Sequence, residues 1–136
     1  MLLNLKINNF ALIKESDIMF TKGLNILSGE TGAGKSIIFE ALSVALGERA
    51  SKSMIKTGTD HSVIEAVFSL TDELKTLLEE KGLISDIDEE TVIIRRDIYL
   101  DYPTVSRING FSATLADLKE ISAYLCDIYG QYEHQL

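Results

Sequence analysis

Cysteine, proline and tryptophan are scarce in this sequence. The chain of 136 residues has one cysteine, one proline and no tryptophan. A single thiol, that of Cys126, can build neither a disulfide framework nor a cysteine metal cluster, and the apolar residues around it favour a buried, inert side chain. Hydrophobic residues make up 46% of the chain and charged residues 25%. These proportions exclude a disordered or fibrous protein and predict one globular domain.

Long apolar runs and an excess of positive charge are also absent. No run approaches the roughly 20 apolar residues that cross a bilayer, so we expect a cytoplasmic protein with no membrane partner. The net charge of −8 opposes non-specific attraction to the phosphates of nucleic acids. This chain alone is therefore not expected to bind DNA, although a larger protein that contains it could do so.

The spacing of apolar residues changes along the chain and so indicates where its elements lie. Alternation at period two indicates a strand from Leu3 that continues towards Phe10 and Leu12. Helical spacing runs from about Lys35 to Leu46, and Gly47 is a suitable C-terminal cap. Further strands are expected at 16–20, 24–28, 62–70, 91–100 and 104–108, and a surface loop at 48–60.

Capping and turn residues predict two more helices and a hairpin. Thr71 can cap a helix that ends near Gly82, and Thr114 can cap a last helix that has an acidic residue in its first turn. The dipeptide Asn109-Gly110 lies between apolar residues and predicts a two-residue hairpin turn, because both turn positions need positive φ.

A glycine-rich segment between the strand expected at 24–28 and the next helix fits the pattern G-x-x-x-x-G-K-[ST] at every fixed position. Its glycines let the backbone bend around a phosphate with no Cβ in the way, so that successive N–H groups point at the anionic oxygens. The start of the helix adds the positive end of its dipole. The predicted phosphate-binding loop consists of Gly29, Glu30, Thr31, Gly32, Ala33, Gly34, Lys35 and Ser36.

Two side chains of this loop have the chemistry that a nucleoside triphosphate with Mg²⁺ requires. Lys35 offers a mobile positive charge that can follow the β- and γ-phosphates, and the Ser36 hydroxyl can enter the octahedral shell of Mg²⁺. The alternative is a glycine-rich strand-to-helix turn with an exposed lysine. Chance rarely supplies both the pattern and its flanking elements, which favours the phosphate site.

A group that could orient an attacking water is harder to find. Hydrolysis usually needs a carboxylate on a neighbouring strand. Asp97 is the nearest match, but Arg95 and Arg96 precede it and the expected hairpin favours antiparallel pairing. We therefore interpret Asp97 as structural.

Three stretches, residues 3–13, 23–36 and 127–135, together resemble the N-terminal head segment of the RecN family. These are bacterial DNA repair proteins of the SMC-like branch of the ABC ATPases. The loop Gly-Glu-Thr-Gly-Ala-Gly-Lys-Ser and the ending Gly-Gln-Tyr-Glu-His-Gln are far more specific than a phosphate loop alone. The resemblance covers essentially the whole chain.

The resemblance implies an α/β fold of the P-loop NTPase type, the N-terminal lobe of an ABC/SMC-type ATPase head with an antiparallel β-subdomain. Residues 1–136 would form the N-terminal half of that ATP-binding head, without its coiled coil and C-terminal lobe. By position, Gln131 is similar to the Q-loop glutamine, which reaches Mg²⁺ and the attacking water. This implies catalytic roles for Lys35 and Gln131 and metal-binding roles for Ser36 and Gln131. The alternative is that Gln131 is a polar residue at a helix end.

Two features depart from the family pattern. The family commonly has histidines where this chain has Tyr129 and Tyr132, so the role of a histidine cluster is not carried over, and His134 alone is more often a surface residue. Related heads often have an arginine near Lys56. Lysine keeps the positive charge but cannot donate the two parallel hydrogen bonds that an arginine guanidinium makes to a phosphate. Lys56 is therefore only a weak candidate for phosphate binding.

The implied function is ATP binding in a head that acts in double-strand-break repair and recombination. The implied partners are ATP, the C-terminal lobe of the same protein, a second head in a homodimer and, through the intact protein, DNA in the nucleoid. Because the family's C-terminal lobe supplies the remaining ATPase motifs, this chain alone is expected to be inactive. A small GTPase is disfavoured because its base-reading motif, Asn-Lys-x-Asp, is missing. A small kinase is disfavoured because the chain has no arginine-rich lid segment. A non-catalytic interaction module that responds to nucleotide stays open.

Overall fold

The computed structural model describes residues 1–20, 32–85 and 89–125, and for residues 32–35 it describes only the helical backbone. The strand expected at 24–28 and the thiol of Cys126 lie outside the described residues. In chain order the elements are β1 (Leu2–Phe10), β2 (Ile13–Met19), α1 (Gly32–Ala45), η1 (Lys52–Met54), β3 (His61–Ser69), α2 (Asp72–Lys81), β4 (Thr91–Tyr99), β5 (Val105–Ile108), β6 (Phe111–Ser112), α3 (Leu115–Ser122) and η2 (Ala123–Leu125).

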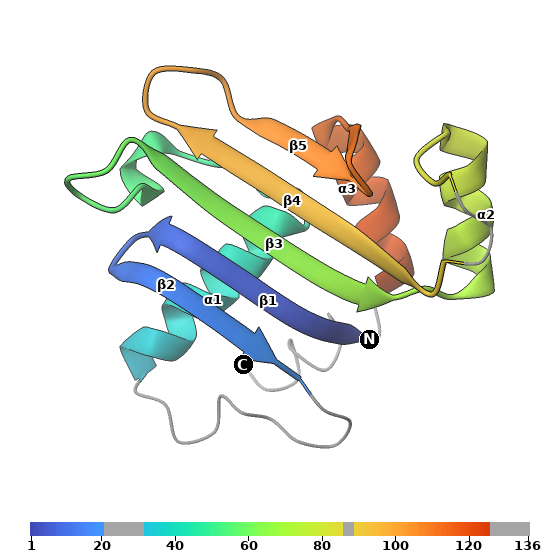
Figure 1. The fold of residues 1–136 in the computed structure, drawn as a ribbon, viewed down its shortest axis with the longest axis horizontal. Coiled ribbons are helices and arrows are strands. Elements are labelled where there is room, and N and C mark those ends of the chain that lie inside the picture. Colours follow the sequence, from blue (N-terminus) through green and yellow to red (C-terminus); the bar gives the residue numbers. More distant parts are fainter. Residues whose placement is uncertain (21–31, 86–88, 126–136) are drawn as a thin grey trace.

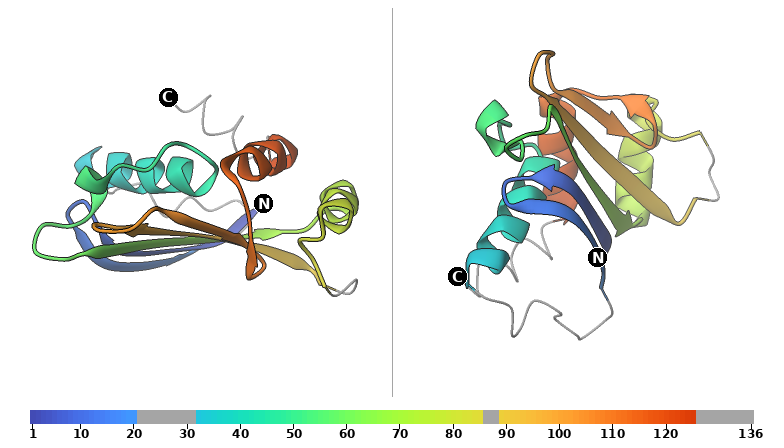
Figure 2. Two further views of the ribbon diagram at one scale, coloured as in Figure 1. Left: turned by 90° about the horizontal axis from the view of Figure 1, so that it is seen from above. Right: turned by 60° about the vertical axis from the view of Figure 1, so that its left-hand side comes forward.

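One antiparallel sheet is the frame of the described fold. It has six strands in the order β2-β1-β3-β4-β5-β6, and each neighbouring pair runs antiparallel (Figure 1). Helices α1 and α3 lie over the same face of the sheet, whereas α2 lies beyond the end of β3 (Figure 2). The described part is therefore a layer of helices on a sheet. None of the helices in the described ranges is long and apolar enough to span a membrane.

Alternating side chains of the central strands build the core between the two layers. Ile64, Ala66 and Phe68 of β3 are completely buried. In β1, Leu5 and Ile7 are equally buried and pair across the sheet with Ala66 and Ile64. Each large apolar side chain contributes about 1.5–3 kcal/mol when fully buried. This alternation fixes which face of the sheet meets the helices, because a shift of one residue would expose every apolar side chain.

Capping and turn residues act as the sequence predicts. Thr71 is the N-cap of α2, and Gly82 ends that helix in the left-handed conformation with φ of 71°. Thr114 caps α3, and its side chain accepts a hydrogen bond from the N–H of Asp117. Asn109 and Gly110 have φ of 52° and 83° and join β5 to β6. These predictions are confirmed because each depends on residues within one turn of the chain.

Two predicted boundaries were wrong. β1 ends at Phe10 and not near Leu12, because the chain turns at Ala11, which has φ of 52°. α1 begins at Gly32 and not near Lys35. The apolar side chains that give a helical period start only after Lys35, so the small residues of the first turn carry no periodic signal.

The surface loop expected at 48–60 has structure of its own. Lys52–Met54 form the 3₁₀ helix η1, and Ser51 caps it with its side chain. Ile55 is buried and forms a β-bridge with Phe10 of β1. The segment after α1 is therefore attached to the sheet, which a pattern rich in serine, threonine and lysine did not predict.

Candidate functional site

The predicted phosphate loop enters the described fold at the start of α1. Residues 29–31 lie outside the described residues, whereas residues 32–35 form the first turn of α1 and Ser36 follows with an exposed side chain. No acidic residue occurs in this first turn. The unpaired N–H groups and the positive end of the helix dipole can therefore attract an anion with no opposing carboxylate from the same turn.

The rest of α1 is packed against the sheet along one side. Ala41 and Ala45 are completely buried, and Ile38 and Leu42 are each only 8% exposed. Glu40, on the other side of the helix, is exposed. The helix crosses the face formed by β1, β3 and β4 (Figure 1). Because its apolar side is buried from Ile38 to Ala45, the sheet determines where the first turn of α1 lies.

The turn between β1 and β2 is bonded to the segment that contains Lys56. The Ala11 N–H donates to the Met54 carbonyl at 2.6 Å, and the Lys56 N–H donates to the Asn9 carbonyl at 2.8 Å. The Lys56 side chain is half-buried. The structure thus fixes the backbone of this weak phosphate candidate against the end of β1.

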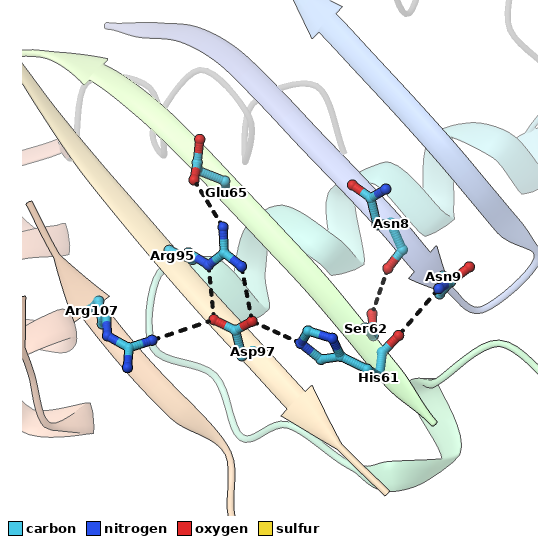
Figure 3. Close-up of polar contacts among 8 residues, drawn as sticks. All are labelled: Asn8, Asn9, His61, Ser62, Glu65, Arg95, Asp97 and Arg107. Carbon is cyan, nitrogen blue, oxygen red and sulfur yellow. Dashed lines mark hydrogen bonds and ion pairs between the residues drawn. The ribbon is translucent and has the colours of Figure 1, made fainter. Parts of the chain in front are cut away.

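A cluster of charged side chains surrounds Asp97 on the face of the sheet turned away from α1 (Figure 3). Asp97 is only 2% exposed. Arg95 donates to both of its carboxylate oxygens, from Nε at 2.9 Å and from Nη2 at 3.1 Å. His61 Nε2 lies 2.8 Å from Oδ1, and Arg107 Nη1 lies 3.9 Å from Oδ2. Glu65 lies 3.6 Å from Arg95 on its other side.

These contacts determine the charge of Asp97. Burial acts to raise its pKa, but the hydrogen bonds from Arg95 and His61 outweigh burial and hold the pKa of Asp97 below its usual value. In turn, the bond to Asp97 raises the pKa of Arg95. Asp97 is therefore an ionised carboxylate whose oxygens are occupied by Arg95 and His61, in agreement with its interpretation as structural.

His61 and Arg107 belong to this cluster and were missed by reasoning from the sequence. Antiparallel pairing brings them together, because His61 lies opposite Tyr99 in β4 and Arg107 lies opposite Arg95. The ring of His61 also stacks on Tyr99, with centroids 4.4 Å apart. The only signal that could have found them is the strand register, which local patterns do not determine.

The remaining predicted site residue, Gln131, lies outside what the structure describes, as do Tyr129, Tyr132 and His134, to which no role was assigned. Within residues 1–20, 32–85 and 89–125, no group of three or more His, Cys, Asp or Glu side chains could hold a metal ion. The Mg²⁺ site assigned to Ser36 and Gln131 therefore stays a prediction.

Known proteins agree with the resemblance drawn from the sequence. The family model described as AAA domain matches residues 4–125. The DNA repair protein RecN of Bacillus subtilis is 41% identical over 138 residues, which cover 100% of this chain. RecN of Halalkalibacterium halodurans is 40% identical over 135 residues, which cover 99% of this chain. The chain spans about a quarter of the length of these relatives, 24% in each case.

A solved structure agrees with the fold. It comes from work on the structural biochemistry of ATP-driven dimerization and DNA-stimulated activation of SMC ATPases. Its chain is 26% identical to this one and superimposes with a TM-score of 0.66, over 88% of this chain and 76% of that one. The α/β fold with an antiparallel sheet, expected from the similarity to SMC-type heads, is confirmed.

Proposed function

The chain belongs to the AAA domain family, and on this premise we propose that residues 1–136 bind ATP with Mg²⁺ as the N-terminal half of an SMC-like ATPase head. The start of α1 is the observation that carries the proposal. The glycine-rich loop leads into a helix whose first turn has no acidic residue and whose apolar side is fixed to the sheet. An anion at that turn meets unpaired N–H groups and the helix dipole.

We assign the roles at this site by residue. The N–H groups of residues 29–36 and the ammonium group of Lys35 would hold the phosphates. Ser36 and Gln131 would hold Mg²⁺, which when bound neutralises charge on the phosphate oxygens. Asp97 takes no part, because its oxygens are occupied by Arg95 and His61. A carboxylate that orients water would come from the C-terminal lobe.

The biological role follows from the relatives. RecN proteins are DNA repair proteins, and the similar SMC ATPases dimerise with ATP and are stimulated by DNA. By similarity, two complete heads of the intact protein would enclose ATP between them and use hydrolysis during repair of DNA breaks. Contact with DNA would be made by the intact protein, because this chain carries a net charge of −8.

Calorimetric titration of ATP and GTP with Mg²⁺ tests the proposal. We expect ATP to bind the wild type, and Lys35→Ala to weaken binding about tenfold or more, because a contact to a charged group worth roughly 1.5–3 kcal/mol is lost. Lys75→Ala is the matched control, since it removes the same charge from α2. The proposal fails if the wild type binds no nucleotide, or if the two variants bind ATP equally well.

Phosphate release separates a half-head from other nucleotide-binding proteins. We expect no ATP hydrolysis by the chain alone and hydrolysis when the C-terminal lobe is supplied separately. Hydrolysis by the chain alone would indicate a small enzyme complete in itself. Binding without hydrolysis in either mixture would indicate a non-catalytic module.

A further inference from the structure

Arg96 lies on the opposite side of β4 from the cluster around Asp97. It occupies the position between Ile94 and Ile98, whose side chains face the helices, and is itself only 2% exposed. Its Nη1 group donates to the Val44 carbonyl at 2.5 Å and to the Glu48 carbonyl at 3.1 Å. Val44 lies in the last turn of α1, and Glu48 lies in the segment that directly follows the helix. Arg96 thus connects the sheet to the end of the helix that is farthest from the phosphate loop.

This guanidinium has no carboxylate partner in the described part of the chain. None of the ion pairs there includes Arg96, and its Nε atom has no hydrogen-bond partner among those residues. Burial lowers the pKa of Arg96, but a guanidinium stays charged near neutral pH. The last turn of α1 has no basic residue of its own. The positive charge of Arg96 therefore meets the negative end of the α1 dipole, and each stabilises the other.

A second contact fixes the same end of α1 from α3. Gly47 follows the helix with φ of 113°, and a Cβ atom added there would lie 3.0 Å from Lys119 Cγ and 3.3 Å from the Lys119 backbone nitrogen. The positive φ favours glycine here, because an added side chain would be strained and would press on α3. The end of α1 is therefore held between β4 and α3.

We propose that Arg96 is a positioning residue for the nucleotide site: it fixes α1 along its axis and so sets where the first turn of α1 meets the phosphates. A helix of 14 residues is roughly 20 Å long and moves as a stiff unit, so a shift at Ala45 is carried to Gly32. Arg96 touches no phosphate, and its effect passes entirely through α1. This inference rests on the proposed ATP site but assigns it a residue 60 positions after the last residue of the loop in sequence.

Two variants disturb this end of the helix by different means. Arg96→Lys keeps the charge but has a single terminal nitrogen on a more flexible stem, so it holds the two carbonyls less well. Gly47→Ala acts from the α3 side. Ile98→Ala is the control, because it creates a cavity on the same strand and face but leaves the hydrogen bonds from Arg96 to the Val44 and Glu48 carbonyls in place.

Titration of ATP against the whole chain, at a temperature where every variant is folded, measures the effect on the site. We expect the Kd for ATP to rise about three- to tenfold in Arg96→Lys and in Gly47→Ala. Ile98→Ala should lower the midpoint of urea unfolding at least as much and leave the Kd within twofold. If Arg96→Lys lowers stability and leaves the Kd within twofold, Arg96 is merely structural and the inference is overturned.

Amide hydrogen exchange tests the same inference without nucleotide. We expect exchange in the first turn of α1, residues 32–36, to become at least threefold faster in Arg96→Lys than in Ile98→Ala under matched stability. If the wild type fails to bind ATP, the proposed function is refuted and this measurement still decides whether Arg96 positions α1. Equal exchange in the two variants overturns the inference, whatever the titration shows.

Discussion

Replacement of Asp97 by asparagine removes the charge at the centre of the cluster on the outer face of the sheet. The amide is nearly the same shape as the carboxylate, so packing changes little. Its nitrogen, however, cannot accept the hydrogen bonds that Arg95 and His61 make with the two carboxylate oxygens. The variant therefore reports on charge and hydrogen bonding, with little contribution from a cavity.

The size of the effect follows from how far each partner is buried. Breaking a fully buried ion pair costs about 3–5 kcal/mol, because the charge that is left behind has no solvation. Here the remaining charges, Arg95 and Arg107, have side chains that are 42% and 44% exposed and can turn to water. We therefore expect Asp97→Asn to lower the free energy of unfolding by about 2 kcal/mol at neutral pH.

The stabilisation by Asp97 should depend on pH in one direction, and it should be lost in acid. The folded state holds the pKa of Asp97 below its usual value, so the stabilisation is present above the unfolded pKa of about 3.9 and is lost as the pH falls through the folded pKa. Urea unfolding followed by circular dichroism should show the full contribution of the Asp97 charge to the difference between wild type and variant at about pH 5. That difference should shrink steadily below about pH 4.

Glu65→Gln is the matched control for Asp97→Asn. Glu65→Gln removes a carboxylate that pairs with Arg95 only at 3.6 Å, and it should cost less than about 0.5 kcal/mol. The reasoning is refuted if Asp97→Asn costs no more than this control, or if its difference from the wild type grows as the pH falls below about 4.

Two further predictions concern local structure. Thr114→Ala should lower the free energy of unfolding by about 1 kcal/mol, because the threonine hydroxyl caps α3 by accepting a hydrogen bond from the Asp117 N–H at 3.0 Å. Thr114→Ser keeps a hydroxyl and should keep the stability. Equal losses in the two variants would disprove the capping role. Gly110→Val should lower the free energy of unfolding by at least about 1–2 kcal/mol, because the φ of 83° at Gly110 suits glycine and strains a β-branched residue. Thermal unfolding measures this loss, and Ser112→Val in the adjoining strand is the control. The prediction is wrong if the two variants unfold at the same temperature.

Elements that depend on nearby residues could be predicted from the sequence. Thr71 and Gly82 delimit α2 through bonds within one turn, and the positive φ of Asn109 follows from the residue types at the hairpin. The start of α1 could not be predicted in this way, because the small residues that follow Gly32 give no apolar period. Identification of the phosphate loop needed no period, since it depends on fixed residue types at fixed spacing.

Contacts between distant segments could not be predicted, because they depend on the register of the sheet. His61 reaches Asp97 only because β3 and β4 pair so that His61 lies opposite Tyr99. For Arg96 a signal was present. Val92, Ile94 and Ile98 alternate along β4, so the position between the last two faces the core, and a charged residue there calls for a specific partner. The sequence could show that Arg96 points inward but not that α1 would supply the carbonyls.

Adjacent residues of β4 thus serve opposite faces of the sheet, and their effects should be separable. Asp97 acts on the outer face through Arg95 and His61, whereas Arg96 acts on the inner face through the end of α1. Asp97→Asn should therefore change how the free energy of unfolding depends on pH in acid, and it should leave the Kd for ATP within twofold of the wild type. Arg96→Lys should raise that Kd and leave the acid part of this pH dependence unchanged, because the guanidinium does not titrate at acidic pH. A severalfold loss of ATP affinity in Asp97→Asn would contradict this separation, because it would mean that disturbance of either face of β4 reaches the first turn of α1.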